Sequence, residues 1–259
     1  SWSWAYTAMA TAMVVGVVTT LLIAEPTRRI DQAVWQEEAR VVAFLERSAH
    51  LPRRIRQVAA WFIGAIVCPF TEFFARNGRI ALGILAFICV FRISDITMGV
   101  MANPFYIDMG YSKADIASVT KVFGLIMTMV GAAMGGVLVA RYGVMRLLLV
   151  SAIMVALTNL VFAWLATQNA DLMLLALVVS ADNLSGGVAG SVFIAYLSGL
   201  TNRAYPAPQY ALCRSLRLLP AKFVGGFSGN VVDGFGYPAF FLSAAARGLP
   251  AVLLVLSLL

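Results

Sequence analysis

Residues 172–200 read LMLLALVVSADNLSGGVAGSVFIAYLSGL, an apolar run whose one charged side chain, Asp182, lies near its middle. A helix needs roughly 20 consecutive apolar residues to cross the hydrocarbon core of a bilayer. A charge placed in such a helix costs about 2.5–3.5 kcal/mol on insertion scales, so it usually faces a cavity or a partner. The run therefore predicts a membrane-spanning helix with a polar centre.

Six further apolar runs have the length of spanning helices. The chain is 61% hydrophobic and only 12% charged, whereas soluble domains carry about 25% charged residues. Both observations predict an all-α membrane protein with seven spanning helices. The six further runs are Trp4–Ala24, Ile80–Met101, Ile116–Val139, Leu147–Ala166, Gln209–Val232 and Pro238–Leu259.

A polar stretch, Glu25–Gln57, follows the first run, and the apolar segment Val58–Phe74 after it contains Pro69 and Glu72. Cytoplasmic loops of membrane proteins accumulate Lys and Arg. If Val58–Phe74 does not span, most basic loops share one face, so we expect an interfacial or re-entrant helix there. This topology also explains the net charge of +7 and removes the argument for a nucleic-acid partner.

An internal repeat appears at an offset of 93 residues, where the stretch 136–143 aligns with 229–236. Each stretch is a helix end, a glycine-containing turn and a new helix. The offset divides the last six helices into two units of three, and the second unit must be inverted because three is odd. Inverted repeats are typical of secondary transporters, although short glycine turns also recur by chance between membrane helices.

The turn Gly136-x-x-x-Ala140-Arg141-x-Gly143-x-x-Arg146 resembles the loop signature of the major facilitator superfamily, which has an acidic residue where Ala140 stands. More specific strings are similar to AmpG-type muropeptide permeases, and this similarity covers essentially the whole chain. These strings are Ile93-Ser-Asp95, Met101-Ala-Asn103-Pro104-Phe105-Tyr106, Asp182-Asn183-Leu-Ser-Gly186-Gly187, Gln209-Tyr210-Ala211-Leu212 and Gly225-Gly226-Phe227-Ser228-Gly229.

The resemblance implies a major-facilitator-type helical bundle. Residues 1–24 would be the last transmembrane helix of the N-terminal half, 25–79 the cytoplasmic central linker, and 80–259 the C-terminal six-helix bundle. It also implies proton-driven import of anhydro-muropeptides across the bacterial inner membrane for peptidoglycan recycling. The expected partners are the lipid bilayer, a small anionic sugar-peptide, protons and the missing N-terminal half.

Four polar residues lie in the middle of predicted spanning helices. Arg92 and Asp95 have the i, i+3 spacing that puts them on one helix face, where they either line the substrate path or form a structural ion pair. Asp182 and Asn183 precede several glycines that loosen a helix. Desolvation favours the neutral form of a carboxyl group, so Asp182 suits proton coupling, or else it makes a helix–helix contact.

Four further residues are candidate substrate contacts. Lys121 either binds an anionic group from the outer side or snorkels to the interface. Lys222 lies beyond Pro220, which permits a kink, and either meets substrate carboxylates or pairs with Asp182. Asn103 and Tyr106 close a helix on the outer side and either hold a sugar or anchor the interface.

Two arginines, Arg214 and Arg217, depart from the family pattern, which has small or apolar residues in this helix. Because they lie one turn apart near the expected cytoplasmic end, we predict an electrostatic anchor. Arg247 lies in the last run without a predicted partner.

Glycines also recur at spacings of four residues, which let helix backbones approach closely. We therefore expect helix packing at each pair. The pairs are Gly131/Gly135, Gly186/Gly190 and Gly225/Gly229.

An enzyme is not expected, because one linker histidine, His50, and three scattered cysteines provide neither a catalytic constellation nor a metal site. No cofactor is predicted. Two alternatives to the muropeptide assignment stay open at this point. One is a related transporter of another organic anion, such as acyl-CoA, and the other is a degenerate, non-transporting membrane fragment.

Overall fold

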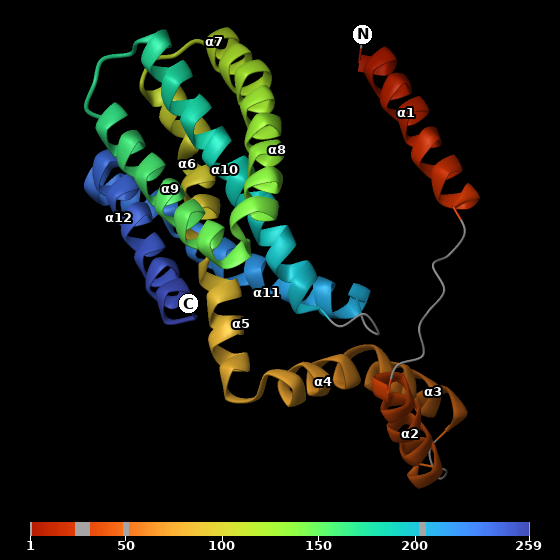
Figure 1. Cartoon of the computed structure of the whole chain (residues 1–259). Helices are drawn as coiled ribbons and strands as arrows, with labels where there is room; N and C mark the ends of the chain where they lie inside the picture. The colour runs from red at the N-terminus through yellow and green to blue at the C-terminus, as the bar shows by residue number, and fades with distance from the viewer. Residues whose placement is uncertain (1, 24–31, 49–51, 202–205, 259) are drawn as a thin grey trace.

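A computed structural model describes residues 2–23, 32–48, 52–201 and 206–258, and every regular element in these ranges is helical (Figure 1). The helices in chain order are α1 Trp2–Leu22, α2 Gln32–Arg47, α3 Arg53–Phe62, η1 Ile63–Val67, α4 Cys68–Asn77, η2 Gly78–Ile80, α5 Ala81–Val90, α6 Ile93–Asp108, α7 Lys113–Ala117, η3 Ser118–Phe123, α8 Gly124–Tyr142, α9 Val144–Leu165, α10 Leu172–Leu200, α11 Pro206–Gly225 and α12 Ser228–Leu258.

Five stretches of the described residues are long and apolar enough to cross a membrane, which confirms the all-α membrane fold. Helix α11 carries Arg214, Arg217 and Lys222 and is not among them, and the apolar part of α1 is shorter, Tyr6–Leu22. The five stretches are Cys68–Asp108, Lys113–Tyr142, Val144–Leu165, Leu172–Leu200 and Ser228–Ser257.

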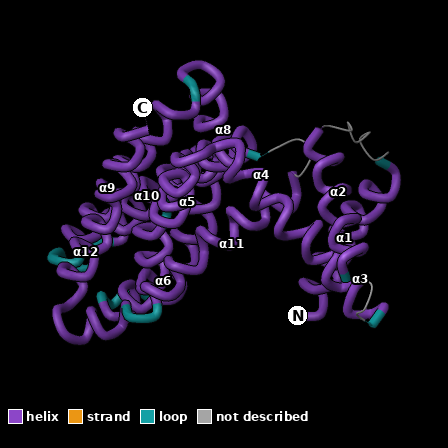
Figure 2. Tube along the Cα trace, turned by 90° about the horizontal axis from the view of Figure 1, so that it is seen from below, coloured by secondary structure: helices purple, strands orange, loops and turns teal. Residues whose placement is uncertain are grey.

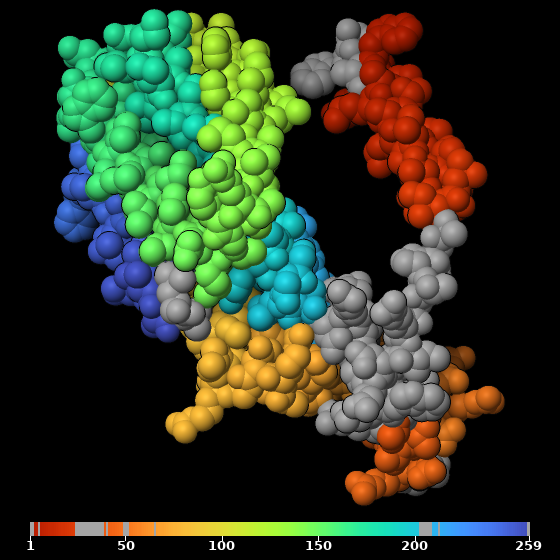
Figure 3. All heavy atoms as spheres, in the orientation of Figure 1, coloured from red at the N-terminus to blue at the C-terminus, as the bar shows by residue number. Residues whose placement is uncertain are grey.

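Helices α5 to α12 form one bundle, whereas α1, α2 and α3 lie to its side and α4 leads from them to α5 (Figures 1 and 2). Figure 3 shows α1 standing apart from the bundle. The described side chains of α1 are all exposed, so its apolar surface has no protein partner within the described ranges. This arrangement leaves the assignment of 1–24 to another half of a transporter as a prediction.

Two helix boundaries differ from the expected ones. The predicted helix Gln209–Val232 ends at Gly225, because glycines are poor helix formers and the amide of Gly226 turns back onto the carbonyls of Lys222 and Phe223. The predicted helix Ile80–Met101 is broken before Arg92, whose φ and ψ are −114° and 14°. It then continues through Pro104 to Asp108.

The predicted repeat turn is present twice with the same backbone conformation. Gly143 has φ 83° and ψ 161°, and Gly236, 93 residues later, has φ 78° and ψ 171°. The left-handed φ favours glycine at both positions. Helix α8 starts near the Asp108 end of α6 and ends at Gly143, so Gly143 lies at the other face of the bundle from Asp108. Tyr237, which follows Gly236, donates a hydrogen bond to Asp108. The two turns thus lie on opposite faces, as an inverted repeat requires.

Helices α8 and α10 approach so closely that glycine is required at their contact. A methyl group at Gly131 would overlap the backbone of Leu184, and one at Gly187 would overlap the backbones of Thr128 and Ala132. Packing at Gly131 and Gly135 is therefore confirmed. The expectation for Gly186 and Gly190 was wrong, because their open sides face a guanidinium group and not a helix backbone.

The bundle has two apolar cores, one toward each end. The first core includes Phe87, Phe91 and Phe193, and the second includes Phe105, Phe162 and Phe241. Between them, each of the central helices contributes polar side chains at mid-length, which we call the polar belt. The belt comprises Ser94, Asp95, Thr97, Thr158, Asn159, Asp182 and Asn183.

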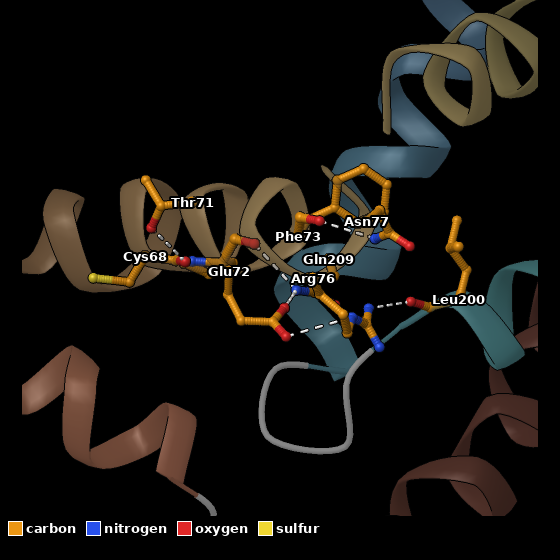
Figure 4. Close-up of polar contacts among 9 residues, drawn as sticks. Cys68, Thr71, Glu72, Phe73, Arg76, Asn77, Leu200 and Gln209 are labelled. Atoms are coloured by element: carbon orange, nitrogen blue, oxygen red, sulfur yellow. Dashed lines mark hydrogen bonds and ion pairs between the residues drawn. The ribbon is translucent and has the colours of Figure 1, made fainter. Parts of the chain in front are cut away.

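Helix α4 is fastened to the ends of α10 and α11 by a polar network (Figure 4). The buried Gln209 amide donates to the Pro69 carbonyl at 3.1 Å and to the Glu72 carboxylate at 2.6 Å. Arg76 pairs with Glu72 at 3.4 Å and donates to the carbonyl of Leu200, the last residue of α10. Pro69 and Glu72, the two residues that made Val58–Phe74 ambiguous in the sequence, thus accept the hydrogen bonds that hold α4 against the bundle.

We predict that Gly187→Ala lowers the melting temperature of the purified protein, because the added methyl group forces α8 and α10 apart. Overpacking of this kind costs about 1–3 kcal/mol. Gly136→Ala on α8 is the matched control, since nothing lies within 4 Å of the position of its added methyl group. The control should leave the melting temperature unchanged or raise it, and equal losses in both variants would contradict the packing argument.

We predict that Gln209→Ala loosens α4, because the Pro69 carbonyl and the Glu72 carboxylate lose a buried donor, at a cost of about 1–3 kcal/mol. The readouts are the melting temperature and the rate of tryptic cleavage at the exposed Arg79. Gln168→Ala is the control, because the Gln168 side chain donates to the adjacent Thr167. Faster cleavage in the control than in Gln209→Ala would refute the role of the network.

Candidate functional site

A cavity of about 420 Å³ opens in the bundle at the level of the polar belt. It is formed by the start of α6, the middle of α8 and the middle of α10. Four of the eight residues predicted from the sequence line it together. The lining residues are Arg92, Asp95, Thr128, Ala132, Asp182, Asn183, Gly186, Gly187, Gly190, Ser191 and Ile194.

Arg92 and Asp95 form the ion pair that their spacing predicts. The Arg92 Nε donates to Asp95 Oδ2 at 2.9 Å, and Nη2 donates to the same oxygen. Only 18% and 16% of the two side chains is exposed, so water screens this pair less than a surface pair. The break between α5 and α6 places Arg92 at the first turn of α6, from which its guanidinium reaches across to α10.

The glycines of α10 make room for this guanidinium. A methyl group added at Gly190 would lie 3.4 Å from Arg92 Nη1, and one at Gly186 would lie 3.9 Å from Nη2. Helix α10 is continuous from Leu172 to Leu200, so the expected loosening by glycine is not seen. The glycines act here by their lack of a side chain, and the helix interruption lies on the opposite wall.

Asp182 and Asn183 lie side by side on α10 but have different surroundings. Thr128 donates to the Asn183 carbonyl oxygen at 3.0 Å, and the Asn183 amide donates to the Val179 carbonyl at 2.8 Å. Asn183 therefore links α10 to α8. The Asp182 carboxyl group has Asp95, Arg92 and the hydroxyl of Thr158 as its electrostatic and hydrogen-bonding neighbours.

The site thus contains two carboxyl groups and one guanidinium group within interaction range. The guanidinium is bonded to Asp95 and leaves Nη1 directed toward Gly190. Arginine carries five N–H donors, so donors remain for an anionic ligand. A proton on Asp182 would bring the three groups to zero net charge.

The other four predicted residues do not line this cavity. Lys121 lies in η3 and Lys222 in α11, and both are exposed. The suggested pair of Lys222 with Asp182 was wrong, since no such ion pair occurs among the described residues. Asn103 is exposed on α6.

Tyr106 is buried in the second core. Only 4% of it is exposed, and its ring centroid lies 5.7 Å from that of Phe105 and 6.4 Å from that of Phe162. A sugar stacked on this ring would have to displace core residues. The structure therefore places Tyr106 as a packing residue close to the site.

Sequence reasoning missed Thr128, Ser191 and Thr158 because uncharged hydroxyls do not stand out in an apolar run. Thr128 is nevertheless the hydrogen-bond partner of Asn183. The only sign of this role in the sequence is that Thr128 lies about one helical turn after Gly124. A larger hollow of about 510 Å³ lies on α3 and η1. Arg54 is the one polar residue of its lining, so it lacks the paired carboxyl groups of the cavity in the bundle.

The sequence profile of the Major Facilitator Superfamily matches residues 1–212. With the helical bundle and the inverted repeat, this match shows that the chain belongs to the Major Facilitator Superfamily. Membership of this family indicates a membrane transporter rather than an enzyme.

Among its relatives, the chain is 33% identical to the Putative transporter AmpG 4 of Rickettsia conorii over 204 residues, which cover 79% of this chain and 49% of the relative. It is 29% identical to the Anhydromuropeptide permease of Escherichia coli K12, over 98% of this chain and 46% of the relative. An uncharacterized protein of Haemophilus influenzae is 32% identical over 74% of this chain. The chain therefore spans about half the length of the curated relatives it matches.

Proposed function

We propose that this chain forms the C-terminal half of a proton-coupled importer of anhydro-muropeptides in the bacterial inner membrane, serving peptidoglycan recycling. In this proposal residues 1–24 are the last helix of the N-terminal half and 25–79 are the cytoplasmic linker. Residues 80–259 are the six-helix bundle that rocks against the missing half. The bacterial relatives named AmpG and Anhydromuropeptide permease support the substrate class.

The observation that carries the proposal is the cavity with Arg92, Asp95 and Asp182 at the level of the polar belt. Intramembrane ionisable residues usually mark substrate or ion paths, and sites at the midplane of repeat units are typical of transporters. A muropeptide carries carboxylates and a polar sugar. Arg92 provides charged donors for the carboxylates, and Asn183 and Thr128 provide neutral hydrogen-bonding groups.

The proton in this proposal binds to Asp182. Asp95 is already bonded to the guanidinium, whereas Asp182 lies near Arg92 but forms no ion pair within the described ranges. With both carboxylates ionised, the site is net negative and repels an anionic substrate. A proton on Asp182 removes that repulsion, so substrate and proton enter together and leave together when the cavity opens to the other side.

Three predicted contacts stay proposals in this scheme, and Tyr106 does not touch the substrate in it. Asn103, Lys121 and Lys222 are exposed on the bundle, where the missing half or the substrate would meet them. Tyr106 would act by holding the second core beside the site.

The test uses the transporter expressed from its complete coding sequence in a host without its own anhydro-muropeptide permease. We predict that Asp182→Asn abolishes uphill accumulation of radiolabelled anhydro-muropeptide but retains exchange of internal for external substrate, because the neutral amide mimics the protonated carboxyl group. Asp95→Asn should lose both activities, because it leaves Arg92 without its anionic partner.

The exposed Asp233→Asn serves as the control and should accumulate substrate normally. Competition with unlabelled acyl-CoA distinguishes transport of another organic anion. Normal accumulation by both site variants would refute the proposed coupling.

A further inference from the structure

Arg217 is a charged residue that the proposed mechanism does not use. The sequence predicts it as a headgroup anchor together with Arg214. In the structure Arg214 is exposed, as an anchor should be, but Arg217 is only partly exposed. Its guanidinium carbon lies 5.2 Å from the ring centroid of Phe193, and its Nε is buried without a hydrogen-bond partner in the described part of the chain. The two arginines therefore have different roles.

Phe193 links Arg217 to the break between α5 and α6, where Arg92 lies. Its fully buried ring stacks on Phe91, with centroids 5.0 Å apart and an interplanar angle of 8°. Phe91 directly precedes Arg92 at the break between α5 and α6. Arg217 is close enough to both Arg92 and Asp95 for their charges to interact. The charges of two guanidinium groups thus act on one carboxylate, Asp95, which is already bonded to Arg92.

The inverted repeat gives an independent reason for Arg217 to face the site. At the offset of 93 residues, Arg217 on α11 corresponds to Gly124 on α8. Gly124 faces the site residue Asn183, since a methyl group there would lie 3.2 Å from its amide nitrogen. Helix α11 contacts α5 and α6 as α8 contacts α10. By the repeat, Arg217 is therefore expected to face α5 and α6, beside the residues that line the cavity.

Arg217 has no carboxylate bonded to it in the described part of the chain. A cation in the membrane interior is unfavourable without a partner, and a cation–π contact recovers only part of that cost. Asp95 can neutralise one arginine of the two. Arginine is also the preferred residue for bidentate recognition of carboxylate groups.

We propose that Arg217 and Arg92 together form an anion-binding subsite at the Gly190 end of the cavity, which holds a carboxylate of the transported ligand. The subsite rests on the proposed function only in that the ligand enters through the same cavity. Arg92 contributes Nη1, and Arg217 contributes its unpartnered Nε. Phe91 and Phe193 fix the two guanidinium groups and limit access of water.

The test is arginine labelling with phenylglyoxal, which modifies accessible guanidinium groups, on the complete protein in nanodiscs with peptide mass spectrometry. The probe is succinate, and succinamide is its neutral counterpart. We expect succinate to slow labelling of Arg92 and Arg217 by about fivefold, because charge-assisted bonds occupy both groups. Succinamide should have no effect. Arg141 is the internal control, since it also lies over an aromatic ring, Tyr142 at 5.5 Å, but is exposed.

Two variants separate the subsite from a structural role of Arg217. In Arg217→Gln, succinate should no longer protect Arg92, a result that does not require Arg217 itself to react. In Arg217→Lys, which keeps the charge but loses the planar fork, protection of Arg92 should be partial. Their melting temperatures report whether the fold is intact. Full protection of Arg92 in Arg217→Gln, or protection of Arg141 equal to that of Arg92, would overturn the subsite.

The same variants keep this inference distinct from the proposed function. If succinate protects both arginines but the complete protein does not import anhydro-muropeptide, the subsite stands and the proposed substrate fails. If import proceeds and Arg217→Gln leaves the KM for anhydro-muropeptide unchanged, the proposed function stands and the subsite fails.

Discussion

The Arg92–Asp95 ion pair lies between two apolar cores and is therefore largely removed from water. The surrounding helices must compensate for the free energy that this desolvation costs. Removing a charge from water costs several kcal/mol per ion, and only good geometry with further hydrogen bonds compensates for it. The break between α5 and α6 brings Arg92 to the same carboxylate oxygen with two of its nitrogens. The absence of side chains at Gly186 and Gly190 leaves the guanidinium space on α10. A regular helix at Phe91–Arg92 would disturb this arrangement.

The close contact of α8 and α10 supports the same site from the other wall. Gly131 and Gly187 bring the two backbones together, and this approach allows Thr128 to reach Asn183. On neighbouring positions of α10, Gly187 thus serves helix packing, whereas Gly186 and Gly190 line the cavity and face Arg92. Stability and binding depend on adjacent residues of one helix, so a substitution that shifts α8 also shifts the cavity.

The fold and half of the site are predictable from the sequence because charges within apolar runs stand out. Arg92, Asp95 and Asp182 are such charges, and the repeat turn at Gly143 and Gly236 has a glycine signature. Spacing alone does not say which neighbour a residue meets. It therefore assigned Gly186 and Gly190 to helix packing, and it placed Arg217 with Arg214 at the interface. Arg217 lies over the ring of Phe193, which belongs to another helix. A local sequence pattern cannot predict such a contact.

The inverted repeat explains the framework of the site but not its chemistry. At the offset of 93 residues, Asp182 corresponds to Cys89 and Arg92 corresponds to Ser185. Each charge on one wall thus has an uncharged counterpart on the other, although the two walls are built from equivalent helices in opposite orientation. A symmetric set would place like charges opposite each other, which would repel. The present arrangement sets a cation on one wall against a carboxyl group on the other, which is the arrangement that the proposed coupling of a proton to an anion requires.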